Sequence, residues 1–292
     1  MQTKTPLISV VMPTYNHGKF IFEAVSSVLN QTFQDFELLI IDNNSEDETD
    51  QVLSQFRDNR IRIYKIQNGG IIAKSRNVGI KLALGEWIAF IDSDDSWTSE
   101  KLDKAVKVIN SKNDVIYHHL FILKENKIEG RIIARKLKRP ILKDLLVKGN
   151  AIPNSSAMVR KNLILRVGGL SEEPNLVGIE DYNLWLKISK KSEGFHLLDE
   201  TLGTFRKHQK NITNMEDYLA PISTLQKFEK YLSTREIKCM YALHDYIAGS
   251  FQYKKKNHST AVVLFKKSLQ NVDLIIRSKS FLKLVKIFIS ST

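Results

Sequence analysis

The chain has 292 residues, 42% of them hydrophobic and 26% charged, which is ordinary for a globular protein of one large or two modest domains. Its formal net charge of +12 suits binding to nucleic acid, anionic lipid or a phosphorylated substrate. The single cysteine, Cys239, excludes an intramolecular disulfide and a zinc–thiolate cluster, and it favours a reducing compartment. We find no secretory signal pattern and no apolar run near the roughly 20 residues that span a bilayer. We therefore expect a cytoplasmic protein.

Apolar runs alternate with helical patterns through the first hundred residues. The expected strands cover Leu7–Pro13, Phe36–Asp42, Ile61–Ile66 and Trp87–Ile91. Residues 19–31 and 71–84 have helical spacing, and Ser45 with Glu48 forms the pattern of a capping box for another helix. Because parallel strands buried between helices are apolar on both faces, the pattern predicts an α/β fold with a mostly parallel sheet.

Three of these strands end in polar residues. The ends are Thr14-Tyr15-Asn16, Asp42-Asn43-Asn44 and Asp92-Ser93-Asp94. Ligands of parallel sheets bind beyond the carboxyl ends of the strands, so we expect the three ends to meet at one rim.

The rest of the chain is less regular. Residues 114–123 and 155–160 are typical of strands, and Glu180–Lys191 is typical of a helix. After Asn214 the pattern is helical, so we predict an α/β domain at residues 1–214 and a helical region at residues 215–292. The last predicted helix, residues 274–289, is basic and amphipathic. Its apolar face carries Leu274, Phe281, Val285 and Phe288.

Three acids follow the fourth strand within four residues: Asp92, Asp94 and Asp95. Alternate residues of an extended chain face the same side, so Asp92 and Asp94 can point together into the rim. Two such carboxylates suit Mg²⁺ or Mn²⁺, whose shells are completed by water and substrate phosphates. The alternative is an acidic turn in which one of residues 94–96 caps a helix that starts near Ser99. The two other polar strand ends favour the metal site.

Several stretches resemble one enzyme family in their order along the chain. They are SVVMPTYNHGKFIFEAVSSVLNQTFQDFELLIIDNNSEDET, AKSRNVGIKLALGEWIAFIDSDDSW, SSAMVR, VGGL and EDYNLW. Together they resemble family 2 glycosyltransferases of the bacterial surface-polysaccharide type, over roughly residues 7 to 190. The resemblance implies the GT-A fold, a Rossmann-like sheet flanked by helices. It also implies transfer of a sugar from a nucleotide diphosphate to an acceptor hydroxyl, with inversion at the anomeric carbon.

The resemblance also implies roles for single residues. Asp94 would bind the metal, and Asp92 would lie near the ribose and is a further candidate ligand. Asp42 would hydrogen-bond the uracil ring, and Arg76 would lie near the nucleotide. The full expected set of nucleotide-sugar contacts is Thr14, Tyr15, Asn16, Asp42, Arg76, Asp92, Ser93 and Arg206.

An inverting transfer needs a general base for the acceptor hydroxyl. The family's base is the acid of an ED pair, here Glu180-Asp181. Helical spacing places Asp181 with Leu184 and Trp185, so we expect Asp181 on the buried face and Glu180 with Lys187 on a more solvated edge. We predict Asp181 as the base and Glu180 as a supporting or acceptor-binding catalytic residue. The alternative is an acidic first turn favoured by the helix dipole.

A late segment, TFRKHQKNIT, resembles the family's RxHxxNxT pattern. It makes His208 a candidate metal ligand and Arg206 a candidate phosphate contact, and a basic surface loop is the alternative. The Q/RxxRW motif and the membrane helices of processive synthases are absent from the sequence. We therefore expect one sugar to be added per binding event.

The expected function is inverting, Mn²⁺- or Mg²⁺-dependent transfer of a hexose or N-acetylhexosamine from a UDP-sugar. The acceptor would be a lipid-linked saccharide in surface polysaccharide synthesis, such as O-antigen or capsule. The basic C-terminal helix would hold the enzyme at the inner face of the membrane, unless it packs on the catalytic domain or in a homodimer. The rival functions are a basic nucleic-acid-binding protein and a non-catalytic sugar-nucleotide-binding module. No nucleic-acid recognition motif is present, so we expect no nucleic-acid partner.

Overall fold

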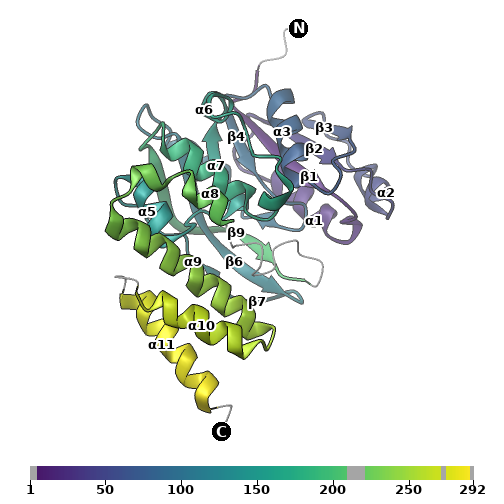
Figure 1. The fold of residues 1–292 in the computed structure, drawn as a ribbon. Coiled ribbons are helices and arrows are strands. Elements are labelled where there is room, and N and C mark those ends of the chain that lie inside the picture. The colour runs from purple at the N-terminus through teal and green to yellow at the C-terminus, as the bar shows by residue number, and fades with distance from the viewer. Residues whose placement is uncertain (1–4, 209–220, 271–273, 290–292) are drawn as a thin grey trace. The chain divides into compact units, whose positions relative to one another are not determined.

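The computed structural model describes residues 5–208, 221–270 and 274–289 (Figure 1). The chain forms two compact units, residues 1–137 with 151–210 and residues 138–150 with 211–292. The sequence did not indicate that residues 138–150 group with the C-terminal helices. The predicted boundary at residue 214 lies outside the described residues and stays a prediction.

One mixed sheet forms the centre of the first unit. Its strands are β1 (Ile8–Thr14), β2 (Phe36–Asp42), β3 (Ile61–Lys65), β4 (Trp87–Phe90), β5 (Ser96–Trp97), β6 (Val115–Lys124), β7 (Lys127–Ile132), β8 (Met158–Arg160) and β9 (Phe195–Arg206). The order is β3-β2-β1-β4-β8-β6-β9-β5, with β7 beside β6. The first four strands are mutually parallel, as the alternating pattern predicted. β8 is antiparallel to β4 and β6, whereas β9 is parallel to β6.

Helices cover both faces of the parallel strands, which is why those strands are apolar on both sides. The helices of the first unit are α1 (Gly18–Leu29), α2 (Thr49–Leu53), α3 (Ile72–Leu82), α4 (Lys101–Lys107), α6 (Lys161–Arg166) and α7 (Glu180–Ser189). On one face, Val25 of α1 and Leu102 of α4 share a core with Val10. On the other face α3 approaches so closely that a Cβ on Gly79 would lie 2.5 Å from a methyl group of Val11.

The structure excludes the helix-cap alternative for the acids after β4, and it shows that the capping box expected at Ser45 and Glu48 is wrong. Ser96 and Trp97 form β5, and the next helix begins only at Lys101, so the acids do not cap a helix. Similarly, α2 begins at Thr49 without a side-chain cap, and the Ser45 hydroxyl donates to Asp42 instead.

The second unit is helical, as predicted for the C-terminal region. Its helices are α5 (Ile141–Lys148), α8 (Ile222–Gln226), α9 (Thr234–Lys254), α10 (His258–Ser268) and α11 (Leu274–Ile289). α9 and α10 form a hairpin, and α11 packs on α10 through Leu284 and Ile287. The face of α11 that carries Phe281 and Phe288 is exposed instead. No helix in the described residues is long and apolar enough to cross a membrane.

Candidate active site

Hydrogen bonds join the polar residues at the ends of β1 and β2. Asp42 is fully buried and accepts hydrogen bonds from the backbone N–H of Ser45 at 3.1 and 3.2 Å. The backbone N–H of Asn16 donates to the Ser45 hydroxyl at 2.9 Å, and Tyr15 beside it is half exposed. The Thr14 hydroxyl is buried without a hydrogen-bond partner among the described residues. Buried polar atoms normally have a hydrogen-bond partner, so this hydroxyl is a candidate contact for a ligand that brings a polar atom.

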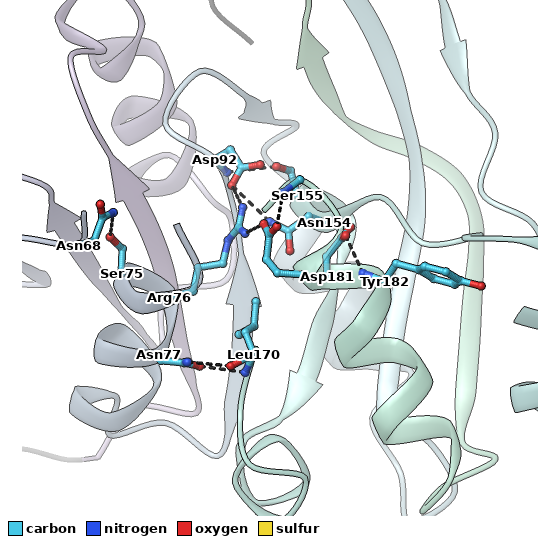
Figure 2. A network of polar contacts seen from close by, with 12 residues as sticks. Asn68, Ser75, Arg76, Asn77, Asp92, Asn154, Ser155, Leu170, Asp181 and Tyr182 are labelled. Atoms are coloured by element: carbon cyan, nitrogen blue, oxygen red, sulfur yellow. Dashed lines mark hydrogen bonds and ion pairs between the residues drawn. The ribbon is translucent and has the colours of Figure 1, made fainter. Parts of the chain in front are cut away.

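The three acids after β4 have three different environments. Asp92 accepts from the Arg76 guanidinium at 2.6 Å and from the Asn154 amide at 3.3 Å, while its own N–H donates to Ser155 (Figure 2). Burial raises the pKa of Asp92, and the Arg76 charge opposes the rise. Asn154 and Ser155 were not expected at the site. They come from a short 3₁₀ turn, residues 154–156, that leads into β8. Ser155 begins the SSAMVR stretch that resembles the family, and this resemblance was a signal for the segment that we did not convert into a site residue.

Asp95 is buried and anchors the acid loop to β9. Its carboxylate accepts the backbone N–H of Arg206 at 2.9 Å. Burial and the charges of Asp94 and Asp92 raise its pKa well above the ordinary value. The Arg206 guanidinium donates to the backbone oxygen of Asp94 at 3.1 Å and lies over the ring of Phe20. These contacts hold the backbone of the acid loop, and the phosphate contact of Arg206 stays a prediction.

Asp94 lies in a cluster with two histidines. The His208 ring nitrogen Nε2 is 2.9 Å from Asp94 Oδ2. His17, in the turn after β1, has Nδ1 2.7 Å from the Ser93 hydroxyl. One ligand atom from each of His17, Asp94 and His208 lies within 4.8 Å of the others, a donor set and spacing that fit a divalent cation.

The predicted metal residues are thus only partly brought together. Asp94 and His208 are in contact. Asp92 instead forms an ion pair with Arg76, and among the described residues it does not belong to the group that could hold a cation. His17 was missed. The signal that could have found it is a histidine three residues beyond Thr14, in a loop that a parallel sheet brings to the same rim.

The burial predicted for the ED pair is wrong. Glu180 is 5% exposed and Asp181 is the more exposed of the two. The reason is that Glu180 forms an ion pair with the buried Arg76 and accepts the backbone N–H of Gly178 at 2.6 Å. The sequence could not show this pair, because its two members are far apart along the chain.

Asp181 lies in the first turn of α7, close to the same arginine (Figure 2). Loss of hydration and the Glu180 charge raise its pKa to about 7, against the opposing effect of Arg76. A carboxyl group that titrates near neutral pH is well matched to general-base chemistry. The pair therefore divides into a buried acid bound to Arg76, Glu180, and a more accessible candidate base, Asp181.

Comparison with known proteins identifies the family. Residues 9–166 match the model of glycosyl transferase family 2. The UDP-Glc:alpha-D-GlcNAc-diphosphoundecaprenol beta-1,3-glucosyltransferase WfgD of Escherichia coli is 33% identical over 63% of this chain and 70% of its own length. The putative teichuronic acid biosynthesis glycosyltransferase TuaG of Bacillus subtilis is 28% identical over 69% of this chain and 79% of its own.

Solved structures confirm the predicted fold. The crystal structure of S. aureus TarS 1-349 superposes with a TM-score of 0.61 at 19% identity, over 96% of this chain and 88% of TarS. The mannosyltransferase PcManGT from Pyrobaculum calidifontis, solved with GDP-Man and Mn²⁺, gives a TM-score of 0.63 at 15% identity, over 94% and 79%. The chain has the GT-A fold, and it belongs to glycosyl transferase family 2 and is a glycosyltransferase.

Proposed function

We propose that the chain transfers one hexose or N-acetylhexosamine from a UDP-sugar to a hydroxyl of a lipid-linked saccharide. The transfer inverts the anomeric carbon, depends on a divalent cation, Mn²⁺ or Mg²⁺, and serves surface polysaccharide synthesis such as O-antigen or capsule. One observation carries the proposal: Arg76 pairs with both Asp92, after β4, and Glu180, beside the candidate base. The donor-binding rim and the ED pair therefore belong to one site. The donor and acceptor in the name of WfgD support the choice of substrates.

The donor half of the site consists of the strand ends. Asp42 and the Thr14 hydroxyl, which has no hydrogen-bond partner within the described part of the chain, would contact the base. Tyr15 would lie beside the base, and Asp92 would contact the ribose. A cation held by Asp94 and His208 would neutralise the negative charge that grows on the diphosphate leaving group. Arg76 is 3% exposed and lies between two carboxylates, so its role is to position them.

The acceptor half is built on α7. Asp181 would accept the proton of the acceptor hydroxyl as its oxygen attacks the anomeric carbon and the bond to the diphosphate breaks on the opposite face. Glu180 stays bound to Arg76, and its negative charge helps to raise the pKa of Asp181 to about 7. A base of this strength is mostly ionised at slightly alkaline pH and remains able to take a proton.

The exposed face of α11 suits a peripheral enzyme that meets its lipid-linked acceptor at the inner membrane surface. Leu274, Phe281 and Phe288 are exposed there, on a helix that also carries exposed Arg277 and Lys286. Apolar side chains flanked by cations bind anionic bilayers. A second copy of the chain is the competing occupant of this face.

The test is transfer to undecaprenyl-diphosphate-linked GlcNAc from a panel of UDP-sugars with Mn²⁺. We expect one UDP-sugar to give a single-sugar extension whose anomeric configuration is opposite to that of the donor, as read by NMR. Asp181→Asn should abolish the transfer. Asp103→Asn, which changes a partly exposed acid of α4, should not. Retention of configuration, or transfer from GDP- or dTDP-sugars alone, would overturn the proposal.

A further inference from the structure

We infer that His17 is a third protein ligand of the cation, and that the donor set of His17, Asp94 and His208 selects a first-row transition ion over Mg²⁺. The inference deepens the proposed function and rests on it, because it concerns the same cation. It adds a ligand from a different part of the chain and narrows the choice between Mn²⁺ and Mg²⁺.

The three side chains come from three separate places along the chain. His17 follows β1, Asp94 follows β4, and His208 follows β9. Their ligand atoms nevertheless lie within 4.8 Å of one another. The two imidazole rings are nearly perpendicular, at 84°, with centroids 5.9 Å apart. Two rings at this separation can each direct one nitrogen toward a shared point beside the carboxylate.

The His17 ring is held in place by Ser93, the residue before Asp94. Its Nδ1 is 2.7 Å from the hydroxyl of Ser93, so the nitrogen that would bind a cation is Nε2. Metal-binding histidines characteristically use their second nitrogen in this way, and the outer partner fixes the ring and its tautomer.

Phe20 of α1 packs against both rings. Its centroid is 4.7 Å from that of His208 and 6.0 Å from that of His17. The Arg206 guanidinium lies over the same phenyl ring, at 5.3 Å. Both imidazoles are therefore positioned by packing within the protein, which is the arrangement expected of a prepared metal site.

The donor set determines which ion binds best. Mg²⁺ prefers oxygen ligands in octahedral geometry and dehydrates reluctantly. Imidazole nitrogen suits transition ions, and affinity rises from Mn²⁺ through Co²⁺ in the usual order. Two imidazoles with a single carboxylate therefore disfavour Mg²⁺ at this site.

The test is Mn²⁺ binding without nucleotide, followed by electron paramagnetic resonance (EPR). Wild type should show pulsed-EPR couplings to two imidazole nitrogens, and Mg²⁺ should displace Mn²⁺ only at large excess.

His17→Ala should remove one nitrogen coupling and weaken Mn²⁺ binding by about tenfold or more. His17→Gln keeps a side chain of similar size but lacks the imidazole, so it should lose the same nitrogen coupling and weaken Mn²⁺ binding as His17→Ala does. His196→Ala, at the far end of β9, should match wild type. His17→Asp replaces nitrogen with oxygen and should reduce the preference for Mn²⁺ over Mg²⁺.

Two results would overturn the inference. One is wild-type Mn²⁺ affinity and unchanged nitrogen couplings in both His17→Ala and His17→Gln, and the other is equal competition by Mg²⁺ in wild type. If Asp94→Ala then still lost Mn²⁺ while UDP binding remained intact in wild type, the proposed function would stand without His17. A wild-type protein that binds neither Mn²⁺ nor UDP would instead contradict the proposed function itself.

Discussion

Replacing Arg76 by methionine should destabilise the first unit, and more at neutral than at acidic pH. The guanidinium is 3% exposed and pairs with Asp92 at 2.6 Å and with Glu180, whose side chain is 6% exposed. Methionine keeps much of the aliphatic volume but leaves two carboxylates without their cation. Removing one partner of a buried ion pair costs about 3–5 kcal/mol of unfolding free energy. Because Arg76 forms two such pairs, we expect Arg76→Met to lower the unfolding free energy by about 3–5 kcal/mol.

The dependence on pH follows from the sign of the pKa shift. Burial already raises the pKa of Asp92, and the Arg76 charge opposes that rise. Without Arg76 the pKa of Asp92 should rise further above its unfolded value. An acid of this kind reduces stability progressively as the pH rises from its unfolded pKa to its folded pKa. The loss caused by Arg76→Met should therefore be larger at pH 7.5 than at pH 5.

The assay is urea unfolding followed by tryptophan fluorescence at the two pH values. The three tryptophans, Trp87, Trp97 and Trp185, are buried in the first unit and report its unfolding alone. Lys107→Met removes an exposed ion pair with Asp103 and should cost less than about 1 kcal/mol. An Arg76→Met loss as small as that of this control at pH 7.5, or an equal loss at both pH values, would refute the reasoning.

Three further predictions concern chemistry and location. Asp181→Asn should keep UDP affinity and lower the transfer rate by about 10²–10⁴-fold, measured by titration and by product formation; a rate near wild type would remove the base assignment. Because the pKa of Asp181 is raised to about 7 and the base must be ionised, kcat should rise between about pH 6 and pH 8 and then level off, and a flat profile there would exclude this titration. Phe281→Ser with Phe288→Ser should weaken sedimentation with phosphatidylglycerol vesicles relative to Leu84→Ser, another exposed apolar residue; equal sedimentation would assign the α11 face to another partner.

The parallel half of the fold could be predicted because its signals are local. The strand predicted at Phe36–Asp42 matches β2, and residues 274–289 match α11. Apolar runs buried on both faces and helical spacing are each contained in one short stretch of sequence. We could also predict that the three polar strand ends lie at one edge of the sheet, because the carboxyl ends of parallel strands meet at the same edge.

The contacts within the site were harder to predict because they join distant parts of the chain. Glu180 is buried against Arg76, and His17 lies beside Ser93 and near His208, which follows β9. Helical spacing correctly placed Trp185 in the core, where it is fully buried. It failed for the first turn of α7, where a buried cation attracts an acid that the apolar pattern alone would assign to solvent.

The assembly of residues 138–150 with the C-terminal helices was likewise beyond the sequence pattern. α5 lies within this segment and packs against α9, which is far along the chain. Nothing in the residues that flank α5 distinguishes it from a helix of the first unit. Non-local packing of this kind is decided by tertiary contacts rather than by local propensity.

The most direct test of the account is calorimetric titration of UDP in the presence of Mn²⁺ and then of EDTA, on wild type and Asp94→Ala. The account predicts binding that needs the cation and is lost in the variant, with the fold of the variant verified by its tryptophan fluorescence. UDP binding that is the same with EDTA, or the same in Asp94→Ala, would contradict a nucleotide site organised around a cation on Asp94.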